Sequence, residues 1–366
     1  MKDDDAVLTY LEDDGIKIEP EYYMPVLPMV LINGAQGIGT GYSTQVPSYD
    51  PKVVIEAVRG WIKRQDRPGG ALGVMWKPWY RGFTGTIEAI GNGVAQCSSG
   101  AIDDGKKLRS RGTLEIVSTN KVRVTELPLG VWTEDFKEAL EALIAGTPDI
   151  KSYSNDSSES KVDFTLTFTN GAVAKAWTAP EERSCSLSRL ETQLKMSSSK
   201  GLAMTNMHLF DPSGRIKKYE SPDDIINDFC EVRLKGYEAR RTHMIAACAE
   251  EVKVLSNRAR FIEMVNSGEL KLGNRGDEEL DADLEARGFD RITAATAEAE
   301  AEADGGSSGG FSYLLGMKLS SLTQKRKEQL EALLADRQAK LRALEASTPV
   351  EIWLEDIEDL QRLLIK

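Results

Sequence analysis

The sequence predicts an α+β protein in which a β-rich part is followed by long amphipathic helices. Between positions 81 and 168, short segments alternate apolar and polar residues, as half-buried strands do. After Tyr219, apolar residues recur at spacings of three and four, as they do on one face of a helix. With 366 residues the chain is long enough for about two or three domains with cores of their own.

The first part of the chain combines prolines, one apolar run and a glycine loop. The run over 25–32 (PVLPMVLI) predicts a short buried strand or extended stretch, because Pro25 and Pro28 do not fit the interior of a helix. The loop over 33–41 (NGAQGIGTG) follows it. The segment 50–63 then predicts an amphipathic helix, with Asp50 as N-cap and Pro51 at the first helical position.

The β-rich part contains four segments with strand-like alternation and one helical segment. The expected strands are 85–90, 113–117, 121–125 and 162–168, and the expected helix is 133–145. The segment 98–111 has almost no apolar residues, so it predicts a surface loop.

Two long helices are expected in the last third of the chain. The first begins at Ser221-Pro222, with acidic residues in its first turn. Its apolar residues follow a heptad pattern: Ile245, Cys248, Val252, Leu255, Ala259 and Ile262. A second such helix begins near Leu322 and ends before Pro349. The two helices together predict an antiparallel coiled coil, and the Ala-, Glu-, Gly- and Ser-rich stretch 294–310 predicts a flexible insertion.

Charge and cysteine content restrict the function only weakly. The net charge is −12, yet 52–81 carries seven basic residues against two acidic ones, so the total neither proves nor excludes a DNA partner. The four dispersed cysteines and two histidines do not suggest a zinc site. No apolar run is long enough to span a membrane. The acidic N-terminus, with Asp3, Asp4 and Asp5, is expected to be a solvated tail and neither a secretion signal nor a metal site.

The glycine loop is the most specific local feature. A P-loop requires Lys and then Ser or Thr after its last glycine, whereas Gly39 is followed by Thr40 and Gly41. One interpretation is a tight loop that uses Gly37, Gly39 and Gly41 for positive φ. The other is a DNA-kinking wedge, in which the glycines let a partner approach and present Ile38 alone at the tip.

Several segments resemble a known family. They are 19–44 (EPEYYMPVLPMVLINGAQGIGTGYST), 82–88 (GFTGTIE), 125–133 (TELPLGVWT), 206–211 (NMHLFD), 214–219 (GRIKKY) and 311–317 (FSYLLGM). Together they resemble eukaryotic-type DNA topoisomerase II, in order and over essentially the whole chain. The resemblance implies a winged-helix tail over 1–30, a mixed α/β tower domain over 31–219, a first coiled-coil arm over 220–265, an exit-gate region over 266–317, a second arm over 318–347 and a C-terminal helix over 348–366.

The resemblance also implies contacts with double-stranded DNA. It assigns DNA intercalation and bending to Ile38, with neighbouring contacts from Gly37, Gly39 and Thr40. It assigns further DNA contacts to Trp132, Lys195, Lys200 and Asn206. The residues alone leave Trp132 open as a packed core residue and leave the Lys195–Asn206 segment open as a solvated loop. Two positions depart from the family pattern: Gln36 replaces a usual acid, and Gly130 replaces a common arginine.

In this family a tyrosine that follows an arginine breaks the DNA, acidic residues of a separate domain hold Mg²⁺, and a further domain uses ATP. We expect the nucleophile to precede this chain, so Tyr10, Tyr22 and Tyr23 are not catalytic, and we expect the chain to bind neither metal nor ATP and to be inactive alone. It is expected to be a fragment, or else a separately encoded partner, that works with the upstream half of the enzyme. The resemblance further implies a homodimer joined through the exit gate, no membrane association and a nuclear location.

Two alternatives come from other functional classes. A non-catalytic DNA-bending protein would keep Ile38 and the basic patches without a partner enzyme. A coiled-coil dimerisation module would form a stable dimer, and its DNA binding would not depend on Ile38.

Overall fold

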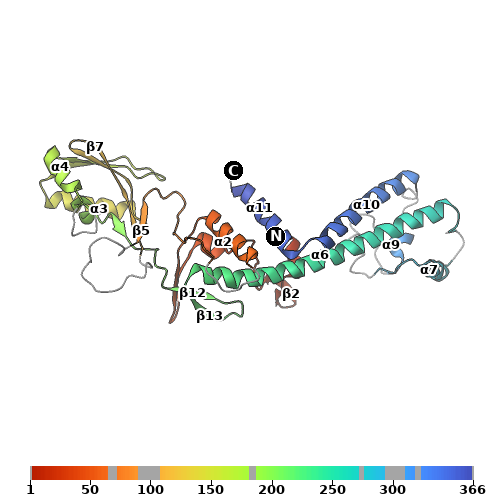
Figure 1. Ribbon diagram of the computed structural model, residues 1–366. Helices are drawn as coiled ribbons and strands as arrows, with labels where there is room; N and C mark the ends of the chain where they lie inside the picture. Colours follow the sequence, from red (N-terminus) through yellow and green to blue (C-terminus); the bar gives the residue numbers. More distant parts are fainter. Residues whose placement is uncertain are drawn as a thin grey trace. The chain divides into compact units, whose positions relative to one another are not determined.

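The computed structural model describes residues 2–64, 72–89, 108–180, 187–271, 276–292, 310–317 and 323–364. These residues form an α+β protein, which confirms the expected fold class (Figure 1). The chain forms two compact units: Met1–Met24 with Arg233–Asp359, and Pro25–Val232 with Leu360–Lys366. None of the described helices is both long and apolar enough to cross a lipid bilayer.

The unit built on Pro25–Val232 is β-rich. Its elements are α1 (Met29–Asn33), β3 (Ala35–Ile38), β4 (Ser43–Val46), α2 (Pro51–Lys63), β5 (Thr86–Ala89), β6 (Leu108–Arg111), β7 (Thr113–Ser118), β8 (Lys121–Glu126), α3 (Thr133–Gly146), β9 (Ile150–Asn155), β10 (Phe164–Phe168), α4 (Gly171–Thr178), α5 (Arg189–Gln193), β11 (Ser197–Ser198), β12 (Met207–Phe210) and β13 (Ile216–Tyr219). The strands form a four-stranded sheet in the order β7-β8-β10-β9, a three-stranded sheet β11-β6-β5 and the hairpins β3–β4 and β12–β13.

The main core of this unit lies where helices cover the four-stranded antiparallel sheet. Alternate residues of β10, Phe164, Leu166 and Phe168, are buried, as the sequence alternation predicts. Phe136 of α3 packs edge-on against Phe164 with ring centroids 5.0 Å apart. Buried Trp177 of α4 satisfies its indole N–H by donating to Asp149 at 2.9 Å. Figure 1 shows α3 and α4 beside these strands.

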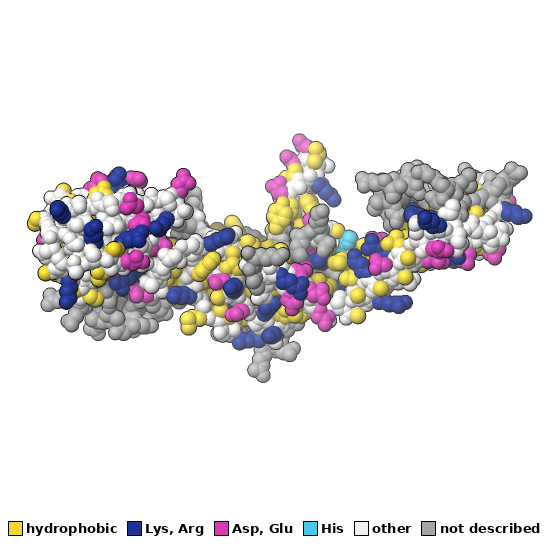
Figure 2. Space-filling view, turned by 90° about the horizontal axis from the view of Figure 1, so that it is seen from above, with side chains coloured by type: hydrophobic (Ala, Val, Ile, Leu, Met, Phe, Trp, Pro, Cys, Tyr) yellow, Lys and Arg dark blue, Asp and Glu magenta, His cyan; other side chains and the backbone are white. Residues whose placement is uncertain are grey.

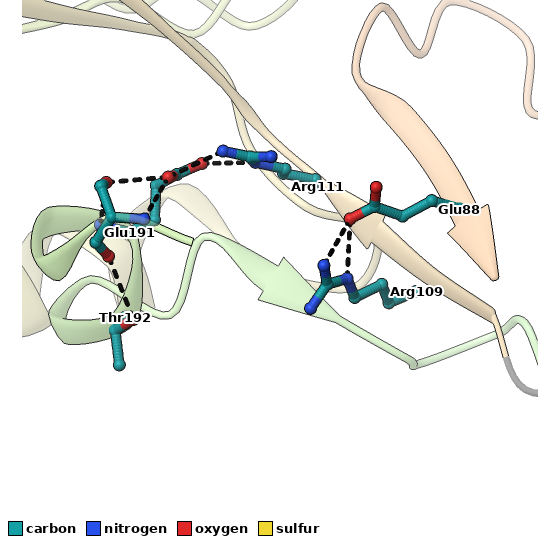
Figure 3. Close-up of polar contacts among 6 residues, drawn as sticks. Glu88, Arg109, Arg111, Glu191 and Thr192 are labelled. Atoms are coloured by element: carbon teal, nitrogen blue, oxygen red, sulfur yellow. Dashed lines mark hydrogen bonds and ion pairs between the residues drawn. The ribbon is translucent and has the colours of Figure 1, made fainter. Parts of the chain in front are cut away.

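An ion pair between half-buried Arg111 and buried Glu191 joins the three-stranded sheet to α5. Arg111 at the end of β6 donates from Nε and Nη2 to the two carboxylate oxygens of Glu191, at 2.5 and 2.9 Å (Figure 3). Ser188 caps α5 and donates to Glu191 from both its backbone N–H and its hydroxyl, at 2.8 Å each. Burial raises the pKa of Glu191, but the hydrogen bonds from Arg111 and Ser188 outweigh it and hold the pKa below its usual range.

We expect Glu191 to make stability depend on pH. Because its folded-state pKa is lowered, the carboxylate stabilises the fold above its unfolded pKa of about 4.3, and this contribution is lost as the pH falls through the folded pKa. Glu191→Gln should therefore destabilise the chain by about 2 kcal/mol at pH 7, because hydrogen bonds to a charged group are lost. Urea unfolding at pH 7 and pH 3 measures the difference in unfolding free energy between the wild type and Glu191→Gln. This difference should be smaller at pH 3, and the same difference at both pH values would contradict the prediction.

The unit built on Arg233–Asp359 is mainly helical. Its elements are η1 (Lys2–Val7), β1 (Tyr10–Asp13), β2 (Ile16–Pro20), α6 (Pro222–Asn266, which begins in the other unit), α7 (Asp277–Ala286), α9 (Ser312–Leu315), α10 (Gln324–Ala346) and α11 (Pro349–Leu364). The helix start at Ser221 is confirmed by reciprocal capping hydrogen bonds. The Ser221 hydroxyl accepts from the Asp224 N–H at 3.3 Å, and the Asp224 carboxylate accepts from the Ser221 N–H at 3.0 Å.

Helices α6 and α10 pack as the antiparallel pair that the heptad pattern predicts. At one end Arg241 donates to the carbonyl oxygens of Leu344 and Glu345, at 3.2 and 2.9 Å. At the other end Lys327 pairs with Glu263 at 3.2 Å. Between them lies an apolar cluster of Leu255, Ile262 and Leu330, with Leu334 packed against it. The predicted insertion over 294–310 lies outside the described residues, except for Gly310.

A buried charged network ties the N-terminal segment to α6 and α11. Asp4 is 2% exposed and accepts a hydrogen bond from Arg233, itself 1% exposed, at 3.1 Å. Arg240 pairs with Asp356 of α11 at 2.8 Å, and the same carboxylate oxygen accepts from the Tyr237 hydroxyl at 2.7 Å. The expectation of a solvated acidic tail is therefore wrong for Asp4. Its partners lie more than 200 residues away in sequence.

Two further expectations of secondary structure are wrong. The run 25–32 contains the start of helix α1, because Pro28 occupies the N-cap position, where a missing N–H is harmless, and Met29 begins the helix. The expected surface loop over 98–111 includes strand β6 at Leu108–Arg111, in which Ser110 is fully buried. The remainder of that expected loop, 98–107, lies outside the described residues.

Candidate nucleic-acid interface

The glycine loop forms a hairpin that presents Ile38 to the solvent. Strands β3 and β4 pair antiparallel from Ala35↔Val46 to Ile38↔Ser43. A four-residue turn closes the hairpin, in which the Gly39 N–H donates to the Tyr42 carbonyl at 2.8 Å. The Ile38 side chain is 93% exposed, the highest value among the described large hydrophobic residues. Single exposed aliphatic side chains are common on protein surfaces, so the significance of Ile38 depends on the hairpin that holds it there.

The glycines of the hairpin are only partly explained by its own geometry. Gly41 has a φ of +84°, whereas Gly37 and Gly39 do not have positive φ, so the tight-loop interpretation holds for Gly41 alone. A Cβ at Gly37 would meet Thr44 at 3.9 Å, and one at Gly39 would meet the Tyr42 carbonyl at 3.7 Å. Both are ordinary contact distances. Neither the backbone nor the internal packing therefore requires glycine beside Ile38.

Asn206, immediately before strand β12, supports this hairpin. Its carbonyl accepts from the Gln45 N–H at 2.8 Å, and its side-chain amide donates to Ser43 Oγ at 2.8 Å. Its amide oxygen lies 2.9 Å from His208 Nδ1. The His208 ring meets the Tyr42 ring edge-on, with centroids 6.0 Å apart. The structure thus brings Asn206 to the loop of Gly37, Ile38, Gly39 and Thr40, as a support of the hairpin.

Trp132 and Lys200 lie together beside Gly130. Trp132 is the N-cap residue of α3 and is 76% exposed, which excludes the interpretation as a packed core residue. Gly130 has a φ of +73°, and a Cβ there would come within 3.1 Å of the Lys200 side chain. The Lys200 ammonium group donates to the Gly130 carbonyl at 3.3 Å. Gly130 therefore provides the room in which the Lys200 stem packs.

An open cavity connects this loop with the base of the hairpin. It has a volume of about 550 Å³, and its wall includes Gln36 and Gln45 on one side and Gly130, Lys200 and Gly201 on the other. Lys195 follows α5 and is exposed, with a φ of +52° that is unusual for a residue with a side chain. It does not line this cavity.

The surface charge is mixed. Figure 2 shows Lys and Arg side chains interspersed with Asp and Glu over one face, and no single basic patch dominates that view. Local cations such as Lys200 therefore matter more than the net charge of −12. Within the described ranges there is no group of three or more His, Cys, Asp or Glu residues that could hold a metal ion.

Sequence reasoning missed Tyr42, His208 and the strand that carries His208. A signal was present: MHLF and IKKY flank a DPSGR segment, and Asp, Pro, Ser and Gly are typical turn residues between two strands. The cross-hairpin contact of Tyr42 with His208 joins positions 166 residues apart, which no local pattern could indicate.

A sequence model of the family of DNA gyrase/topoisomerase IV A subunits matches residues 1–358. The chain belongs to this family of type II DNA topoisomerases. It is 36% identical to a DNA topoisomerase 2 of Penicillium chrysogenum over 97% of its length, and 36% identical to one of Arabidopsis thaliana over 100% of its length. It covers 22% and 25% of those two relatives, respectively.

A solved structure is also similar to the chain. It is the DNA-binding, cleavage and re-ligation domain of Plasmodium falciparum topoisomerase II, with a TM-score of 0.78 and 31% identity. The match covers 99% of this chain and 47% of that one. Topoisomerase 2 relatives and this structure agree with the resemblance found in the sequence, so the family expectation is confirmed. The chain corresponds to part of a type II topoisomerase.

Proposed function

We propose that this topoisomerase chain binds and bends duplex DNA, with Ile38 inserting between base pairs as the wedge. The observation that carries the proposal is the exposed Ile38 at the end of β3, held by a closed hairpin. Partial unstacking of a base step costs a few kcal/mol, and an apolar wedge offsets this cost by removing its own surface from water. A 93% exposed isoleucine has nearly its whole surface available for such burial.

The flanking residues support the same proposal. The fold of the hairpin does not require glycine at positions 37 and 39. Because Gly37 and Gly39 have no side chains, the sugar–phosphate backbone of DNA can approach on both sides of Ile38. Thr40, exposed in the turn, offers a hydroxyl for a phosphate contact. Asn206 then acts as a positioning residue for the wedge, because its amide already bonds to Ser43 and its carbonyl to Gln45.

Trp132 and Lys200 are proposed to hold the DNA on one side of the wedge. The exposed indole offers a flat apolar face and an N–H donor, and the Lys200 ammonium group offers a phosphate contact. Lys200 lines the cavity that reaches the hairpin base, and Trp132 follows Leu129 and Gly130 of its wall in sequence. Lys195 is proposed as a further phosphate contact, supported by its exposure alone.

The activity of the whole enzyme is also a proposal. We infer that the chain works within a type II topoisomerase that passes one duplex through a transient double-strand break in another, driven by ATP. The nucleophilic tyrosine, the Mg²⁺ site and the ATPase are assigned to other parts of that enzyme, with which this chain associates.

The domain roles follow the family. We propose that 1–30 is the winged-helix tail, 31–219 the tower, the α6–α10 pair the coiled-coil arm, and the segment around Tyr313 the exit gate at which two copies meet. The antiparallel packing of α6 against α10 supports the arm. We also propose a nuclear location, although one relative, from Dictyostelium discoideum, is a mitochondrial DNA topoisomerase 2.

The test is DNA bending measured by energy transfer between dyes at the two ends of a short duplex. We expect the wild-type chain to raise the transfer on binding. Ile38→Ala should bind within about fivefold of the wild-type affinity, because phosphate contacts dominate affinity, yet fail to bend the duplex. Ile116→Ala, at an exposed residue of β7, is the matched control and should bend DNA normally. Normal bending by Ile38→Ala would refute the wedge, and absence of binding by the wild type would refute the proposed function.

A further inference from the structure

A second hairpin next to the wedge has an apolar end that the function proposed so far does not use. Strands β12 and β13 pair antiparallel from Met207↔Tyr219 to Phe210↔Ile216 (Figure 1). Met207 and Tyr219 are buried and anchor one end of the hairpin. At the other end Phe210 is 73% exposed and its cross-strand partner Ile216 is 47% exposed. An aromatic and an aliphatic side chain thus form one exposed apolar pair.

The turn that joins the two strands is held in one conformation. The Asp211 carboxylate accepts from the Ser213 N–H and the Arg215 N–H, each at 2.9 Å, and from the Ser213 hydroxyl at 2.7 Å. These hydrogen bonds hold the pKa of Asp211 below its usual range. The only acid of the turn is therefore occupied by the backbone around it. Phe210 and Ile216 flank a preorganised turn, which reduces the entropy lost on binding.

The charge beside the apolar pair is basic. Arg215, Lys217 and Lys218 are all exposed and lie on or next to β13. Lys217 pairs with Asp228 at 2.6 Å and Lys218 with Glu220 at 2.8 Å. The Lys218–Glu220 pair is exposed on both sides, and such pairs contribute only about 0–1 kcal/mol, so a phosphate can replace Glu220 at little cost. Arg215 extends this row of cations to the turn itself.

The position of this hairpin relates it to the wedge. The carbonyl of Asn206, immediately before β12, accepts from Gln45 of β4, and the His208 ring contacts the Tyr42 ring. Phe210 lies two residues beyond His208, a distance of about 7 Å along a strand. One helical turn of duplex DNA spans about 34 Å. Phe210 therefore lies closer to the Tyr42–His208 contact than the length of one helical turn of DNA.

We infer that the β12–β13 hairpin is a second DNA-contact element, at which Arg215 binds a phosphate and Phe210 packs against the neighbouring sugar edges. The inference rests on the proposed DNA bending by Ile38. DNA is favoured over a protein partner because the β12–β13 hairpin carries three exposed cations and its Asn206 end adjoins the wedge hairpin. Two short rigid contacts on one side of a kinked step would hold the bent duplex in register.

Photo-crosslinking tests this contact directly. Phe210→p-benzoylphenylalanine in the full chain, mixed with a dye-labelled duplex of defined sequence, should crosslink to nucleotides at a fixed distance from the kinked step. The same substitution at Ile116, an exposed residue of β7, is the control and should give at least tenfold less DNA adduct. Crosslinking of Phe210 to a second protein chain, or a DNA yield equal to that of the control, would overturn the inference.

The contribution of Arg215 is measured by binding at several salt concentrations. Arg215→Ala should weaken binding and lower the slope of log affinity against log salt by about 1, as expected for the loss of one phosphate contact. Lys151→Ala, at an exposed lysine of β9, should leave the slope unchanged. If the wild type bends DNA through Ile38 while Arg215→Ala behaves like Lys151→Ala, the hairpin inference fails alone. If the wild type does not bend DNA, the proposed function fails with it.

Discussion

Replacing Arg233 with methionine is expected to lower the free energy of unfolding by about 3–5 kcal/mol, because a buried charge loses its partner. Arg233 is 1% exposed and donates to Asp4, which is 2% exposed. Its guanidinium also lies over the Tyr237 ring at 4.1 Å from the centroid. Methionine fills a similar volume but leaves the Asp4 carboxylate with fewer donors in a site that excludes water. Urea unfolding, followed by tryptophan fluorescence, measures the change.

The control is an ion pair at the surface. Lys218→Met removes a pair with Glu220 in which both side chains are about half exposed, and it should change stability by less than about 1 kcal/mol. A double variant, Asp4→Leu with Arg233→Met, removes both buried charges and should be less destabilised than the sum of its single variants. An Arg233→Met variant as stable as Lys218→Met would show that the buried network does not hold the N-terminal segment.

This network also shows which parts of the fold could not be predicted from local sequence. Three consecutive acids at a chain terminus are usually solvated, and nothing near Asp4 indicates otherwise. Its burial depends on Arg233 and Arg240, which a helix of 45 residues brings to it from far along the chain. Strand β6 was missed for a similar reason. Strand β6 is buried because it pairs with β5 on one side and β11 on the other. Its residue Arg111 pairs with Thr86 of β5 and Ser197 of β11, which are far from it in sequence.

Elements with strong local signals were predicted well. Helix α2 starts at Pro51, and the Asp50 side chain accepts from the Lys52 N–H at 2.8 Å, as the N-cap pattern predicts. Helix α6 begins at Pro222, with a proline at its first position and acidic residues in its first turn, as the sequence predicts. Apolar periodicity likewise predicted the faces of α6 and α10 that meet. By contrast, Pro28 was interpreted as excluding a helix, although a proline at the N-cap position permits one directly after it.

The candidate site was predictable where one residue carries the chemistry. Ile38 stands out in the sequence because glycines surround it, and the structure places it at the exposed end of a strand. Asn206 is expected among the DNA contacts, and its hydrogen bonds to Ser43 and Gln45 add a role that the sequence does not indicate, as a support of the β3–β4 hairpin. The role of a polar side chain depends on which partners the fold supplies. Those partners are 163 residues away for Asn206 and Ser43, so sequence could suggest the site but not this role.

The base of the wedge hairpin leads to the other large effect that we expect. Gly34 ends helix α1 with φ 70° and ψ 171°, a conformation that is essentially restricted to glycine. A Cβ at this position would lie 2.8 Å from Ser48 Oγ and 2.9 Å from the Val46 carbonyl oxygen. The Val46 carbonyl belongs to the backbone of β4 and cannot rotate away. Gly34→Ala should therefore lower the free energy of unfolding by about 3 kcal/mol or more, since strain and steric overlap add.

Gly41→Ala separates these two causes in the same hairpin. Gly41 also has a positive φ, of 84°, but a Cβ there would meet nothing within 4 Å. This variant carries backbone strain alone and should lose about 1–2 kcal/mol. Under conditions in which both variants are folded, Gly34→Ala should also bend duplex DNA less than Gly41→Ala. The reason is that the added methyl group displaces β4 from β3 and so changes the orientation of the Ile38 side chain. Equal stability and equal bending of the two variants would show that the hairpin base tolerates the displacement, and that the wedge does not depend on a rigid support.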